Sequence, residues 1–65
     1  MPKTYQAKVA KINETEWRLF IRSNYYFIPK GAEQVEGQYN ASRKTFEAGQ
    51  RKFKVAQDYS AQELN

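Results

Sequence analysis

WRLFIRSNYYFI, residues 17–28, is the stretch that decides the fold, because only here are large apolar residues dense enough to build a core. Successive side chains of a strand point to opposite sides, so alternation predicts Leu19 on one face and Phe20 on the other. Ser23-Asn24 is interpreted as a two-residue turn, after which residues 25–28 form a second strand. One face is then apolar. The other face interleaves arginine with aromatic side chains, namely Arg18, Phe20, Arg22, Tyr25 and Phe27.

The preceding residues 4–12 also alternate, and their β-branched and aromatic members favour a strand. We expect Ile12 to pair with Glu16, because this register separates the charged side chains from the core. A slip of one residue would exchange the two faces. In the chosen register Lys8 joins the arginines on the outer face. The sequence therefore predicts a three-stranded antiparallel meander over residues 4–28.

The second half of the chain favours a helix. At about 100° per residue, Tyr39, Phe46 and Phe53 fall on one stripe with small residues between them. Basic residues gather on the opposite side of the same helix. The predicted fold class is thus α+β, with the N-terminal three-stranded antiparallel meander followed by a C-terminal amphipathic helix over about residues 40–57.

A competing interpretation places a hairpin in the same region. Residues 44–47 and 50–56 would form its strands around Ala48-Gly49, since glycine is natural in a turn and costs about 1 kcal/mol inside a helix. The fold would then be a small all-β barrel of SH3-like or OB-like size. Both interpretations treat residues 1–65 as a single small domain.

The composition limits what holds this domain together. A chain of 65 residues buries only about 60% of its unfolded surface, and it contains no cysteine and no histidine. Disulfides and zinc, the usual supports of small scaffolds, are therefore not expected. Stability must come from packing, with self-association as one source of further burial.

Catalysis is poorly supported by the same composition. Histidine and cysteine, the commonest general base and the readiest nucleophile, are both missing. The glycines are isolated and form no phosphate-binding loop. We expect no enzymatic activity, no cofactor and no metal site. With no apolar run near 18 residues and no leader pattern, we expect a cytoplasmic protein without a membrane partner.

Charge and aromatic content favour a polyanionic partner. The formal net charge is +4, and the isoelectric point is near 9.5. Single-stranded nucleic acid is bound by rings on which bases stack, set among cations that contact phosphates. We therefore expect a small nucleic-acid-binding protein of low sequence specificity that favours single strands. Its predicted binding residues are Lys8, Arg18, Phe20, Arg22, Tyr25, Phe27, Arg43, Lys44, Arg51, Lys52 and Lys54.

The same residues support an alternative of a different class. Exposed aromatic and arginine side chains are also what protein interfaces contain, so the chain can be a protein-interaction module. It would form a homo-oligomer, or dock on an acidic protein surface as a small inhibitor or regulator. Each aromatic residue can also be ordinary core under the C-terminal segment. The salt dependence of binding distinguishes the two functions. Affinity for nucleic acid falls steeply and log-linearly with salt concentration, whereas an aromatic protein interface persists.

Overall fold

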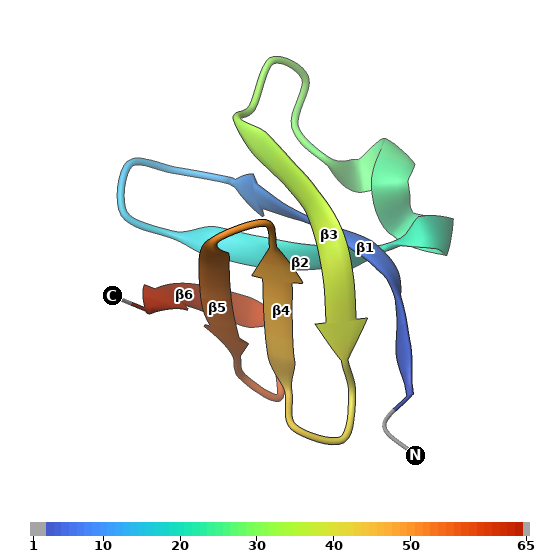
Figure 1. Cartoon of the computed structure of the whole chain (residues 1–65). Coiled ribbons are helices and arrows are strands. Elements are labelled where there is room, and N and C mark those ends of the chain that lie inside the picture. The colour runs from blue at the N-terminus through green and yellow to red at the C-terminus, as the bar shows by residue number, and fades with distance from the viewer. Residues whose placement is uncertain (1–2, 65) are drawn as a thin grey trace.

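The computed structural model describes residues 3–64, which form a closed barrel of six antiparallel strands (Figure 1). Around the barrel the strands follow the order β1-β2-β6-β5-β4-β3. No helix in this part of the chain is long and apolar enough to cross a membrane. The elements are β1 (Thr4–Lys11), β2 (Trp17–Ile21), the 3-10 helix η1 (Arg22–Phe27), β3 (Gln34–Asn40), β4 (Thr45–Ala48), β5 (Arg51–Val55) and β6 (Ser60–Leu64).

The predicted C-terminal helix over residues 40–57, and with it the α+β class, is wrong. The apolar stripe of that helix is a row of cross-strand pairs: Tyr39 lies opposite Phe46, and Phe46 lies opposite Phe53. A spacing of seven residues fits two helical turns, and here it equally fits neighbouring strands joined by short turns. Gly49 occupies the second of these turns with a φ of +62°. The alternative of a small all-β barrel describes the observed architecture.

The first hairpin has the register that the sequence predicts. Lys8 lies opposite Phe20, and the Ile12 N–H donates to the Glu16 carbonyl at 3.0 Å. The expected turn at Ser23-Asn24 and strand over residues 25–28 are wrong, because these residues lie in η1. A two-residue hairpin turn favours residues with positive φ, and this pair adopts none. The meander therefore ends at β2.

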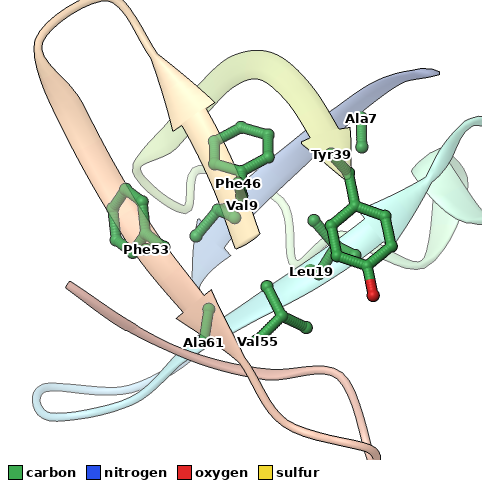
Figure 2. Close-up of a cluster of buried hydrophobic side chains, with 8 residues drawn as sticks. All are labelled: Ala7, Val9, Leu19, Tyr39, Phe46, Phe53, Val55 and Ala61. Carbon is green, nitrogen blue, oxygen red and sulfur yellow. The ribbon is translucent and has the colours of Figure 1, made fainter. Parts of the chain in front are cut away.

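The core lies inside the barrel, and every strand contributes to it (Figure 2). Phe46 and Phe53 are fully buried, with ring centroids 5.8 Å apart. Alternation along β5 places Lys52 and Lys54 on the outside. The interior is thus lined by buried apolar side chains from all six strands. Its members are Ala7, Val9, Leu19, Tyr39, Phe46, Phe53, Val55 and Ala61.

One patch of the outer barrel surface is covered by η1. Phe20 is only 8% exposed and Ala10 is fully buried, although both point away from the barrel interior. The 3-10 helix contacts β1 and β2 at this place. It projects from the side of the barrel rather than closing one of its ends (Figure 1). This placement of η1 creates the surface feature described next.

Candidate interaction groove

A shallow groove of about 240 Å³ lies between η1 and the turn that joins β5 to β6. We call it the η1 groove. Its volume is below the roughly 300 to 1,000 Å³ of typical small-molecule pockets. It therefore suits a side chain of a larger partner better than a free metabolite. The lining residues are Arg18, Leu19, Phe20, Asn24, Phe27, Asp58 and Tyr59.

Aromatic rings form the floor and two walls of the η1 groove. Phe20 contributes to the floor, whereas Phe27 is 61% exposed and Tyr59 is 39% exposed. Tyr26, 79% exposed, extends this surface, with its ring centroid 4.3 Å from that of Phe27. Exposed rings of this size usually mark a surface that contacts another molecule.

Tyr59, which lines the groove, has an energetically unfavourable backbone conformation. Its φ is +70°, a left-handed conformation that bulky residues rarely adopt and that costs roughly 1 to 2 kcal/mol. The turn around it is held by the Tyr59 N–H donating to the Ala56 carbonyl at 2.9 Å. Glycine would relieve the backbone at this position but would remove the ring. Strain of this kind is concentrated at functional sites, which favours a role for the ring.

The η1 groove is lined by one cation, Arg18, and one anion, Asp58. Arg18 is exposed, and its Nη2 donates to the Asp58 carbonyl at 3.3 Å. The Asp58 carboxylate accepts a hydrogen bond from the Ser60 N–H at 3.1 Å. Hydrogen bonds from Ser60 lower the pKa of Asp58, and the charge of Arg18 lowers it further. Asp58 is thus engaged within its own turn, whereas the exposed Arg22 lines a separate hollow with Tyr5 and Ile21.

A larger hollow of about 540 Å³ lies beside the β1–β2 loop, and we do not assign a function to it. It is lined by small or polar residues of β5, β6 and the loop, among them Thr15, Glu16 and Ser60. No aromatic side chain contributes to its lining. The η1 groove is smaller, but two exposed rings, Phe27 and Tyr59, line it together with Arg18. A further hollow of about 400 Å³ combines one exposed ring, Tyr5, with Arg22.

Lys8 of β1 and Tyr25 of η1, both predicted to bind nucleic acid, contact each other instead. Lys8 Nζ lies 4.7 Å from the centroid of the Tyr25 ring, so the cation contacts the aromatic face. The Tyr25 hydroxyl is buried without a hydrogen-bond partner among residues 3–64. Burial raises the pKa of Tyr25, nearby Glu36 raises it further, and Arg22 lowers it. These contacts engage Lys8 and Tyr25 within the protein.

Arg51 lies at one end of the barrel, in a pair with Glu63. Its Nε and Nη2 donate to the two carboxylate oxygens at 2.8 Å and 2.9 Å, a bidentate geometry that favours both charges. The guanidinium carbon lies 5.2 Å from the Trp17 ring centroid and 5.4 Å from that of Phe53. Arg51 therefore closes the end of the core and is engaged on several sides.

The remaining predicted cations lie elsewhere on the barrel. Arg43 and Lys44 occupy the β3–β4 turn, where Lys54 Nζ donates to the Arg43 carbonyl at 3.2 Å. Lys52 lies directly opposite Glu47 on the outer face of β4 and β5. The structure therefore divides the predicted residues. Of these residues, Arg18, Phe20 and Phe27 line the η1 groove, whereas Arg22 lines a separate hollow.

Sequence reasoning missed four of the lining residues, namely Leu19, Asn24, Asp58 and Tyr59. Tyr59 belongs to a turn between strands, and the helical interpretation of this region contained no such turn. Asn24 was assigned to a hairpin turn rather than to η1. The hairpin alternative could have placed a turn between Val55 and Ser60, but nothing in the sequence brings that turn next to η1.

Comparisons with known proteins were made by family model, by sequence and by structure. No family model, no curated protein and no solved structure matches this chain. Within residues 3–64 there is also no group of three His, Cys, Asp or Glu side chains that could hold a metal ion. The functional assignment therefore rests on the geometry and charge of the groove.

We expect the Arg51–Glu63 pair to make the free energy of unfolding depend on pH. The hydrogen bonds from Arg51 lower the pKa of Glu63 from its usual 4.5. A lowered folded-state pKa contributes stability above the ordinary value, and this contribution is lost as pH falls through the folded value. Urea midpoints of wild type and Glu63→Gln should therefore differ at neutral pH and converge as the pH falls below 4.5 and through the lowered folded-state pKa of Glu63. Glu14→Gln, in the β1–β2 loop, is the control, and a gap that stays constant on acidification would contradict the expectation.

Proposed function

We propose that this chain is a small protein-interaction module that docks an acidic segment of a partner protein in the η1 groove. The observation that carries the proposal is the concentration of exposed rings, Phe27, Tyr26 and Tyr59, beside the exposed Arg18. Aromatic and arginine side chains dominate the binding energy of protein interfaces. Positive charge at the rim attracts and orients an acidic partner.

The distribution of rings and cations favours a protein over single-stranded nucleic acid. Of the three rings predicted to stack on bases, only Phe27 is exposed, because Phe20 lies in the groove floor and Tyr25 lies under Lys8. A phosphate backbone needs cations in a continuous row. Here Arg51 is paired with Glu63 and Lys52 faces Glu47, so the row is interrupted.

Charge also favours a different protein over a second copy of this chain. Each copy has a formal net charge of +4, and two η1 grooves facing each other would bring the Arg18 side chains of both copies to one interface. Like charges placed together at an interface oppose association. An acidic segment with an apolar side chain satisfies both the rim and the rings.

The test is selection of random linear peptides displayed on phage against the folded protein, with counter-selection on Phe27→Ser. We expect enriched peptides to contain Asp or Glu together with an apolar residue. Loss of the exposed ring should weaken their binding about tenfold or more, the effect of an interface anchor. Leu64→Ser is the matched control, because Leu64 is 49% exposed on β6 and takes no part in the groove.

Two results would contradict the proposed function. In the first, no acidic peptide is enriched over the counter-selection, or the selected peptides bind Phe27→Ser and wild type equally. In the second, an oligothymidylate binds through Phe27 and competes with the peptides, with affinity that falls log-linearly with salt. The second result would indicate that the groove binds single-stranded nucleic acid.

A further inference from the structure

Strand β2 has an edge that the barrel leaves unpaired beside the η1 groove. β2 pairs with β1 along its whole length, from Trp17 to Ile21, but with β6 only through Trp17 and Arg18. The last backbone hydrogen bond on the β6 side joins the Leu19 N–H to the Tyr59 carbonyl at 2.8 Å. Beyond this bond the chain of β6 turns away, and the groove begins.

The direction of the backbone groups along β2 follows from that bond. In an antiparallel strand, the N–H and C=O of one residue point to the same side, and successive residues alternate. The Leu19 N–H points toward β6, so the Leu19 carbonyl and the Ile21 N–H point to this side as well. Among residues 3–64 no strand lies opposite them there. This edge of β2 thus carries one unpaired acceptor and one unpaired donor, two residues apart. Leu19 lines the η1 groove, whereas Ile21 lines a second hollow with Arg22 and Ser23.

The lining of the groove agrees with this placement. Leu19 lines the η1 groove, although the residue as a whole is only 2% exposed and its side chain belongs to the core. An unpaired strand edge is a template for pairing with another chain.

We infer that the acidic partner segment binds in extended form, as an added strand along the β2 edge. This inference rests on the proposed function and specifies how the partner is held. The Ile21 N–H donates to a carbonyl of the partner, and the Leu19 carbonyl accepts from a partner N–H. The spacing of the two groups matches the repeat of a strand, so one short extended segment reaches both.

Side chains of the added strand alternate, which defines the class of sequence recognised. One apolar side chain lies between Phe27 and Tyr59 over the Phe20 ring, where the groove has about 240 Å³ of space. An acidic side chain next to it reaches Arg18 at the rim. A proline at the position that donates to Leu19 is excluded, because it has no N–H.

The test compares Ile21→Pro with Ile21→Ala, using an acidic peptide selected on the wild-type protein as the probe. Ile21 has a φ of −78°, which proline adopts without strain, so the first substitution removes the edge donor while keeping the backbone path. Both variants lose the isoleucine side chain, but only Ile21→Pro loses the N–H. We expect Ile21→Pro to bind the peptide about tenfold more weakly than Ile21→Ala, as for a lost hydrogen bond to a buried partner.

Amide hydrogen exchange in the wild-type protein gives a second readout that does not depend on how Ile21→Pro folds. The Ile21 amide should exchange quickly in the free protein and slow at least tenfold when the peptide saturates the groove. Equal peptide affinity of the two variants, or an Ile21 amide that remains unprotected in the complex, would overturn strand addition. If Phe27→Ser still abolishes binding in that case, the proposed function stands and only the extended binding mode is lost.

Discussion

Gly37→Ala is expected to unfold the protein. Gly37 lies in β3 opposite Ala7, where an added Cβ would overlap the Glu47 carbonyl and lie 2.8 Å from the Ala48 Cβ. The obstructing atoms belong to the backbone and the first side-chain carbon of β4, which cannot move aside without breaking the β3–β4 ladder. Overpacking typically costs about 1 to 3 kcal/mol and more where backbone obstructs, comparable with the roughly 3 to 5 kcal/mol that a core of this size supplies.

Circular dichroism and urea unfolding measure this effect, with Gly31→Ala as the matched control. Gly31 has a φ of +81°, but a Cβ there meets nothing within 4 Å. The control should therefore lose only about 1 kcal/mol from backbone strain and remain folded. A folded Gly37→Ala with an unchanged midpoint would mean that β3 and β4 are not packed as closely as the barrel requires.

Phe20→Ala is expected to lower the stability of the fold, whereas Phe27→Ala is expected to weaken peptide binding with little effect on stability. Removing the Phe20 ring, 8% exposed, empties the space beneath η1 and should cost about 3 kcal/mol of unfolding free energy. Removing the Phe27 ring, 61% exposed, should cost within about 0.5 kcal/mol while weakening peptide binding. Urea unfolding of the two variants measures the difference. A larger loss of stability in Phe27→Ala would contradict the placement of η1.

The part of the fold that sequence alone predicts correctly is the first hairpin. Its register depends on the pairing of Ile12 with Glu16 and on the separation of Lys8 from the apolar side chains, both of which are properties of neighbouring residues. Local alternation determines which face is buried in a strand pair. The exposure of Arg18 on β2 follows from the same pattern.

The second half of the chain is ambiguous for a physical reason. Tyr39, Phe46 and Phe53 are spaced by seven residues, which places them on one helical face and also opposite one another across β3, β4 and β5. Periodicity cannot separate these arrangements. Closure of the barrel decides between them, because each strand from β3 to β6 gains a partner on both sides, and such long-range pairing leaves no local signal.

The candidate site depends on the same long-range pairing. Phe20 and Phe27 are equivalent in the sequence pattern, and they differ in the structure because η1 folds back over Phe20 and exposes Phe27. Tyr59 reaches the groove only because β6 pairs with β2. Sequence therefore indicates the aromatic and basic composition of the site, whereas the topology determines which residues form it.

The most direct test of the interaction groove is an NMR titration of the isotope-labelled protein with an acidic peptide selected on it. The account predicts that the largest amide shifts occur at Leu19, Ile21, Phe27 and Tyr59, which line the groove or its open edge. Amides around the Arg51–Glu63 pair, at the end of the barrel, should remain unchanged. Shifts concentrated around Arg51 and Glu63, with the amides of η1 unaffected, would contradict the account.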